Sequence, residues 1–130
     1  NSELKIIDSN IVLINSDFDV RFRINREILH RLIIQMGLYS SYEPCMYPGV
    51  NIKYYYNENS NMDGICKCLG KCNGKGKDCC KKITIAVFNS GKIIITGGQS
   101  YNHLNIAYDF INKVINDNKS ELLIWFELNN

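Results

Sequence analysis

The stretch ITIAVFNSGKIIITGG, Ile83 to Gly98, consists of two apolar runs joined by Asn-Ser-Gly-Lys. Alternation of side-chain type with a period of two predicts half-buried strands, and Ser-Gly between such runs predicts a tight hairpin. One face carries branched aliphatic residues and should pack under helices: Ile83, Ile85, Val87, Ile93 and Ile95. The other face should stay uncovered and contact a ligand: Thr84, Ala86, Phe88, Lys92, Ile94 and Thr96.

Two helical patterns flank further strands. Asn25 can cap a first helix that ends at Gly37, and Ser100 can cap a second that ends at Asn116-Asp117-Asn118. Three other segments are predicted to be extended: Ile6–Ile24 with a kink near Ser16-Asp17, Tyr39–Glu43, and Val50–Tyr56. The apolar tail Leu122–Phe126 is expected to pack back on the body. The order strand, helix, four strands, helix predicts an α+β unit.

Length and composition bound the class of protein. With 130 residues, 45% of them hydrophobic, the chain can bury one core, so we expect a single domain over residues 1–130. A net charge of +2 is too small to indicate nucleic-acid binding by itself. No apolar run approaches the roughly 18 residues of a membrane span, and no signal peptide is evident, which predicts a soluble intracellular protein. The chain begins with Asn1 rather than Met, as a fragment of a longer protein would.

Three motifs, in order, resemble one family. DVRFRI (Asp19–Ile24), SSYEPCMYPGV (Ser40–Val50) and VFNSGKIIITGG (Val87–Gly98) are similar to DVKFPI, SSYEPELFPGL and IFVSGKVVLTGAK of the carboxy-terminal repeat of the TATA-box-binding protein family. The resemblance implies half of a saddle: a curved, antiparallel, five-stranded sheet with two helices on the convex face and DNA on the concave face. An abundance of Asn, Ile, Lys and Tyr and an inserted loop favour a divergent, virus-encoded member.

The resemblance also implies a mode of DNA binding. Members of the family lie in the minor groove of A·T-rich DNA and kink it by wedging two aromatic side chains between base steps. Phe88 matches one wedge and Tyr47 stands at the position of the other. The residues expected to contact DNA are Leu13, Asn15, Tyr47, Val50, Lys53, Phe88, Ser90, Lys92, Ile94 and Thr96.

Two departures from the family pattern affect the expected recognition of DNA bases and the expected protein partner. Leu13 replaces an asparagine that reads the minor groove, and Asn15, two residues on, can substitute for it. Glu43 matches a residue that docks a B-type general transcription factor, so such a factor or a viral equivalent is an expected partner. A second glutamate of that surface is replaced by Cys45.

The segment Asn57–Lys82 is an insertion relative to the family and holds five of the six cysteines. Clustered thiolates in a reducing compartment predict a tetrahedral zinc site, although the spacing C-x-C-x3-C-x6-C-C is no standard pair of CxxC motifs. The alternative is a basic loop with free thiols or a disulfide. The candidate ligands are Cys66, Cys68, Cys72, Cys79 and Cys80, and Lys67, Lys71 and Lys81 beside them can favour thiolates or contact phosphate.

Three functions follow as hypotheses. The first is a DNA-binding transcription initiation factor, acting in the host nucleus or in a cytoplasmic viral factory. The second is a protein-interaction module that has lost DNA bending, and the third is an accessory domain of a nucleic-acid enzyme. No combination of nucleophile, base and orienting acid forms a catalytic motif, so the chain itself is not expected to be an enzyme. One repeat covers half of the family's site, so the other half must come from the same chain, a homodimer or another subunit.

Overall fold

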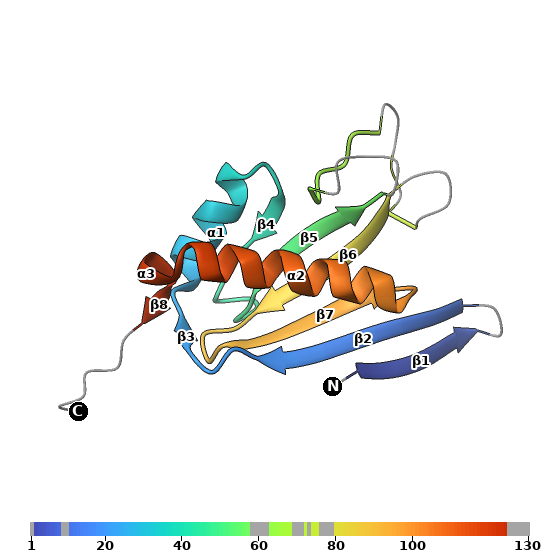
Figure 1. The fold of residues 1–130 in the computed structure, drawn as a ribbon, viewed down its shortest axis with the longest axis horizontal. Helices are drawn as coiled ribbons and strands as arrows, with labels where there is room; N and C mark the ends of the chain where they lie inside the picture. Colours follow the sequence, from blue (N-terminus) through green and yellow to red (C-terminus); the bar gives the residue numbers. More distant parts are fainter. Residues whose placement is uncertain are drawn as a thin grey trace.

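The computed structural model describes residues 2–8, 11–57, 63–68, 72, 74–75 and 80–124, with side chains from residue 15 onward. Six strands form one antiparallel sheet in the order β1-β2-β7-β6-β5-β4 (Figure 1). Their bounds are β1 Ser2–Asp8, β2 Ile11–Asp19, β4 Tyr39–Ser41, β5 Val50–Tyr56, β6 Lys81–Val87 and β7 Lys92–Gly98. The predicted five-stranded antiparallel sheet is therefore present as β2-β7-β6-β5-β4, and β1 extends it at one edge.

The amino-terminal extended segment differs from the prediction. It consists of β1, β2 and the short β3 (Arg23–Ile24) instead of one kinked strand. The pairing of β2 with β7 shifts register between Ile14 and Ser16, next to the expected kink. The extra residue lies on β7, where Gly97 has a φ of +89°. This irregularity is a bulge, which bends a strand and increases its twist.

The carboxy-terminal segment packs back on the body, as expected. A third, short helix α3 (Lys119–Leu122) follows the second, and Leu122 is completely buried. Strand β8 (Leu123–Ile124) then pairs with β3 in a separate two-stranded sheet. Residues 125 and 126 of the predicted tail lie outside the described part of the chain.

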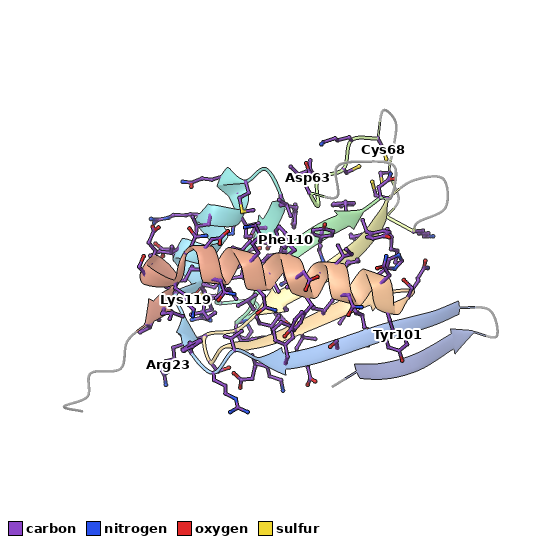
Figure 2. All side chains as sticks on the ribbon, viewed as in Figure 1. Arg23, Asp63, Cys68, Tyr101, Phe110 and Lys119 are labelled. Carbon is purple, nitrogen blue, oxygen red and sulfur yellow. The ribbon has the colours of Figure 1, made fainter. Side chains whose placement is uncertain are left out.

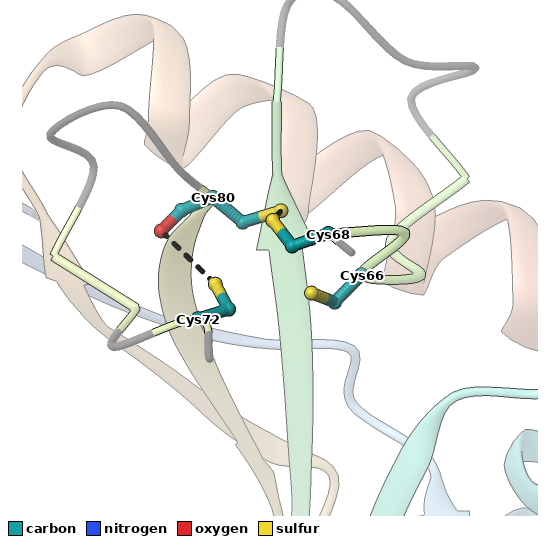
Figure 3. A group of neighbouring side chains, drawn as sticks. All are labelled: Cys66, Cys68, Cys72 and Cys80. Carbon is teal, nitrogen blue, oxygen red and sulfur yellow. Dashed lines mark hydrogen bonds between the residues drawn. The ribbon is translucent and has the colours of Figure 1, made fainter. Parts of the chain in front are cut away.

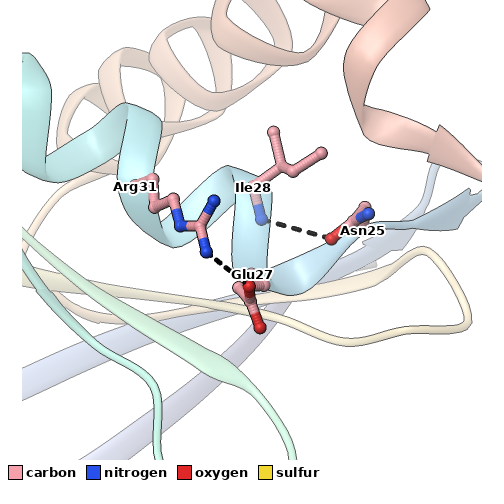
Figure 4. A network of polar contacts seen from close by, with 4 residues as sticks. All are labelled: Asn25, Glu27, Ile28 and Arg31. Atoms are coloured by element: carbon pink, nitrogen blue, oxygen red, sulfur yellow. Dashed lines mark hydrogen bonds and ion pairs between the residues drawn. The ribbon is translucent and has the colours of Figure 1, made fainter.

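Helices α1 (Arg26–Gln35) and α2 (Tyr101–Asp117) begin at the predicted caps. The Asn25 side chain accepts a hydrogen bond from the Ile28 amide at 3.2 Å, and the Ser100 hydroxyl accepts one from the His103 amide. Each cap satisfies a backbone donor that the first helical turn leaves without a partner. On the exposed side of α1, Glu27 and Arg31 form an ion pair one turn apart (Figure 4). Because both side chains are solvated, this pair adds little to stability.

Both long helices cover the same face of the sheet (Figures 1 and 2). Leu29 and Ile33 of α1 and Leu104, Ala107 and Ile111 of α2 belong to one core cluster. The aliphatic face predicted for the hairpin lies in that cluster without exposed surface: Ile83, Ile85, Val87, Ile93 and Ile95. The fold is an α+β half-saddle of the expected kind, in which one sheet face supplies the core.

Gly91 closes the hairpin between β6 and β7. Its φ of +97° lies in the left-handed region, and a Cβ there would stand 2.2 Å from the carbonyl oxygen of Phe22. The Gly91 amide donates to the Phe88 carbonyl, and the Gly91 carbonyl accepts from the Val20 amide, both at 3.0 Å. The turn is thus fixed against the segment that leaves β2, and only glycine fits.

Gly91→Ala should lower the free energy of unfolding by about 2 kcal/mol or more, because the backbone strain adds to the overlap with Phe22. The measurement is urea denaturation followed by circular dichroism. Ser90→Ala is the matched control in the same turn and should change stability by less than about 0.5 kcal/mol. Equal unfolding midpoints for both variants would show that the turn does not constrain the fold as described.

Candidate nucleic-acid interface

The sheet face that the helices leave uncovered is built from cross-strand rows, and we call it the open face. One row runs Tyr39, Lys53, Thr84, Thr96 across β4, β5, β6 and β7. The next row runs Asn51, Ala86, Ile94, Asp17 across β5, β6, β7 and β2. Residues directly opposite one another share a face, so small, apolar and hydroxyl side chains meet at its centre. Lys53, Thr84, Ile94 and Thr96 are half-buried there.

Two aromatic rings meet at one end of the open face. Tyr47, in the turn before β5, and Phe88, after β6, have ring centroids 5.7 Å apart with planes tilted by 59°. Gly49 lies against both rings, since a Cβ there would stand 2.9 Å from Tyr47 and 3.0 Å from Phe88. The Arg26 side chain donates to the Pro48 carbonyl and thereby ties this turn to α1. The structure therefore brings together the two side chains that the resemblance identified as wedges.

Lys53 holds a positive charge near the centre of the open face. Its Nζ donates to the Thr84 hydroxyl at 3.0 Å. Partial burial lowers the pKa of Lys53, and the positive charge of Lys82 lowers it further. The protonated Lys53 side chain is therefore less well solvated than an exposed lysine, and a nearby anion would stabilise its charged form.

Acidic side chains border the same face, and they were not among the residues predicted from the sequence. Asp17 opposes Ile94 and Asp19 opposes Lys92. Lys92 lies 3.8 Å from an Asp17 carboxylate oxygen, and both side chains are about half exposed. The alternation of these two aspartates with Phe18, which packs on the core, could have revealed them. Asn51 and Tyr55 share the face with Lys53 and were not predicted either.

The remaining expected contacts fall in different surroundings. Ser90 and Lys92 lie in and after the hairpin turn, where the Ser90 hydroxyl accepts from the Lys92 amide at 3.3 Å. Asn15 is half-buried and lies on the open face by alternation with Asp17. Leu13 lies in β2 opposite Lys5, and its side chain is outside the described part. Glu43 is exposed, and its carbonyl accepts from the Met46 and Tyr47 amides.

Val50 departs from the expectation that it contacts DNA. Its side chain has no exposed surface and belongs to the core, on the helix-covered face with Ile52. Successive residues of a strand point to opposite faces, so the open face receives Asn51 instead. Val50 therefore packs on the helix-covered side of the sheet, next to the turn that carries Tyr47, and cannot touch a ligand on the open face.

Four of the five candidate metal ligands come together at the far end of β5 and β6. The sulfur atoms of Cys66, Cys68, Cys72 and Cys80 all lie within 4.8 Å of one another (Figure 3). Cys79 is outside the described residues. A hydrogen bond from the Cys68 backbone lowers the pKa of Cys66, whereas burial raises the pKa of Cys80. The thiols therefore differ in how readily they ionise.

The cysteine group adjoins the open face through Tyr55. Burial raises the pKa of the Tyr55 phenol, and the charges of Cys72 and Cys66 raise it further. Tyr55 opposes Lys82 across β5 and β6. The two chemically distinct groups of the molecule, the aromatic pair and the thiols, thus lie near opposite ends of the same two strands.

Comparisons with known proteins agree with this architecture. The family model of transcription factor TFIID (or TATA-binding protein, TBP) matches residues 8–118. A TATA-box-binding protein-like protein of Acanthamoeba polyphaga mimivirus is 31% identical over 126 residues. That match covers 88% of this chain and 28% of the relative, so the chain spans less than a third of the viral protein. The chain belongs to the TATA-binding protein family, and its similarity to a viral member supports a viral origin.

Within the described residues, no helix is both long and apolar enough to cross a membrane.

Proposed function

We propose that this protein is a transcription initiation factor that binds the minor groove of A·T-rich promoter DNA with its open face and bends the duplex. The observation that carries the proposal is the Tyr47–Phe88 pair at one end of that face, in a chain of the TATA-binding protein family. The proposed role is non-enzymatic. It places the protein at viral promoters, in the host nucleus or in a cytoplasmic viral factory.

The chemistry of the open face suits the floor of an A·T minor groove. A·T pairs present only acceptors there, while a G·C pair adds a guanine amino group that projects into the groove. The Thr84 and Thr96 hydroxyls can donate to those acceptors. Ala86 and Ile94 in the adjacent row offer a smooth apolar surface. A guanine amino group would keep this surface from contacting the floor of the groove. Such contacts distinguish A·T from G·C without reading each base.

The aromatic pair supplies the bend. Aromatic side chains inserted at a base step unstack it and kink the duplex toward the major groove, which is the mode of the family. Tyr47 is 40% exposed and adjoins Phe88, so the two rings can enter one step together. The Tyr47 hydroxyl must then reach water, phosphate or a base edge.

Two lysines and a hydroxyl would contact the DNA phosphates. Lys53 on the open face, and Lys92 and the Ser90 hydroxyl at the hairpin turn, are the candidates for backbone contacts, which position a protein without specifying sequence. Specificity would come from the groove floor and from the ease with which a TA-type step deforms. Asn15 would supply polar readout from β2.

A second half-saddle completes the proposed site. It comes from elsewhere in the same chain, from a second copy, or from another subunit. Glu43, exposed at the turn before Tyr47, would contact a B-type general transcription factor or its viral equivalent. If the monomer bound bendable A·T-rich duplex as strongly as a dimer or a longer chain, the need for a second half would be refuted.

Phe88→Ala should abolish bending and weaken binding by about tenfold or more, roughly 1.4 kcal/mol, because the wedge is lost. The measurement is energy transfer between dyes at the two ends of an A·T-rich duplex, titrated with this chain and with a longer parent at two salt concentrations. Tyr47→Phe should retain the bend. Tyr101→Ala removes an exposed tyrosine of α2 and is the matched control. Unchanged bending by Phe88→Ala would contradict the proposal.

Binding should weaken as pH rises toward the lowered pKa of Lys53. Phosphate contact favours the charged ammonium, while burial and Lys82 already favour the neutral form in the free protein. The loss should therefore begin below pH 10.5, the ordinary value for lysine. Lys53→Arg stays charged throughout and should remove this part of the pH dependence. Identical pH profiles for the two proteins would place Lys53 away from phosphate.

The aspartates of the open face favour a second candidate, a protein-interaction module that does not bend DNA. Asp17 and Asp19 would repel phosphate and could attract a basic partner. An accessory domain of a nucleic-acid enzyme is a third candidate, which the longer parent sequence would reveal.

Asp19→Asn separates the first two candidates. Its carboxylate accepts from the Arg21 amide at 2.6 Å, and an asparagine can keep that bond. If the open face binds DNA, removing this charge should strengthen binding by about fivefold at low salt, near 1 kcal/mol. Asp117→Asn on α2 is the control and should have no effect. An Asp19→Asn variant that binds duplex no better would favour the protein-interaction module.

A further inference from the structure

The insertion between β5 and β6 carries a group of residues that DNA binding does not explain. Its described cysteines are up to 14 residues apart in the sequence, and their sulfur atoms converge (Figure 3). The sulfurs of Cys68 and Cys80 are 3.7 Å apart. A disulfide would require about 2.05 Å. Four sulfurs bound tetrahedrally at Zn–S distances of about 2.3 Å would lie about 3.8 Å from one another.

The backbone holds this arrangement from both sides. The Tyr55 amide of β5 donates to the Gly64 carbonyl at 2.9 Å, and the Lys82 amide of β6 donates to the Gly74 carbonyl at 2.8 Å. Gly64 has a φ of +84° and lies against the Tyr54 ring, where a Cβ would not fit. The cysteines therefore stand on segments that are anchored to the sheet by contacts other than their own.

Core packing and a hydrogen bond to a sulfur atom also hold the cysteine segments in place. Ile65, next to Cys66, packs against the core cluster, and Cys80, directly before β6, is 1% exposed. The Asn57 side-chain amide donates to the Cys80 sulfur at 3.6 Å. Hydrogen bonds to ligand sulfurs orient them and are typical of the surroundings of metal sites. A loop with merely free thiols would need none of these features.

We propose that Cys66, Cys68, Cys72 and Cys80 bind one Zn²⁺ ion in a tetrahedral, four-thiolate structural site. Binding replaces the four thiol protons, which are released to solvent, and leaves a site with a net charge of minus two. Lysines lie within three residues of a ligand cysteine in the sequence, among them Lys67, Lys75 and Lys82. Lys67 also forms an ion pair with Asp63 at 3.0 Å. With all four positions filled by protein sulfur, the ion has no open position for catalysis, and its role is to close the loop beside Tyr55.

The test measures zinc by mass spectrometry in protein purified under reducing conditions without chelator. One zinc per chain is expected. Replacement by Co²⁺ should give the visible absorption of a tetrahedral four-thiolate complex, with a sulfur-to-cobalt charge-transfer band. Less than about a tenth of a zinc per chain, together with no such spectrum, would overturn the proposal. This readout uses the unsubstituted protein and does not depend on DNA binding.

Single substitutions test the ligand set. Cys68→Ser should weaken Co²⁺ binding at least tenfold and shift the spectrum, and Cys80→Ser should do the same. Cys45→Ser is the matched control, because Cys45 is exposed in the turn before β5. Cys79→Ser tests the neighbouring candidate and should leave binding unchanged. Loss of metal in Cys79→Ser with retention in Cys80→Ser would overturn the assigned set. Circular dichroism of each variant separates loss of a ligand from loss of fold.

Discussion

At the turn between β6 and β7, the backbone of Gly91 lies against the carbonyl oxygen of Phe22. This contact determines where the two central strands reverse, and hence that Val87 pairs with Ile93. In a sheet, a slip of one residue would exchange the two faces of a strand. The aliphatic side chains would then meet solvent, and the small ones would meet the helices. Strands β2 and β5 pair on either side of this hairpin, so the register of the whole sheet follows from it.

The same constraint separates stability from function. The helix-covered face contributes Ile83, Ile85 and Ile95 to the core, and α1 and α2 exclude water from it. The open face is therefore free to carry hydroxyls, a lysine and small apolar groups that add little to folding. Gly49 connects the two roles, because it leaves room for the Tyr47 and Phe88 rings above while Val50 is buried beneath. The open face therefore lowers the free energy of unfolding only slightly, provided that the hairpin keeps its register.

Features set by local chemistry could be predicted from the sequence. Alternation identified both faces of the hairpin, and the caps at Asn25 and Ser100 located the helices, because each signal depends on a few neighbouring residues. The resemblance identified Tyr47 and Phe88 as a pair, which spacing alone could not do. The error at Val50 arose where family correspondence was preferred to alternation, since Ile52, two residues on, already pointed to the core.

Other features depend on contacts between distant residues. The separation of β1 from β2 was not predicted, because both segments are extended and only their pairing distinguishes them. The spacing of the cysteines could not show which of them converge. That depends on where Gly64 and Gly74 attach to β5 and β6. Asp17 and Asp19 could have been found, but net charge conceals an acidic margin on a weakly basic chain.

Inosine–cytosine pairs test directly whether the open face lies in a minor groove. An I·C pair matches A·T in the minor groove, because inosine lacks the amino group of guanine, but it matches G·C in the polar groups of the major groove. The measurement is the affinity for three duplexes of equal length, A·T-rich, I·C-substituted and G·C-substituted. If the open face lies in the minor groove, I·C should bind within about threefold of A·T, while G·C should bind about tenfold or more weakly. Equal weakening by I·C and G·C would contradict binding in the minor groove.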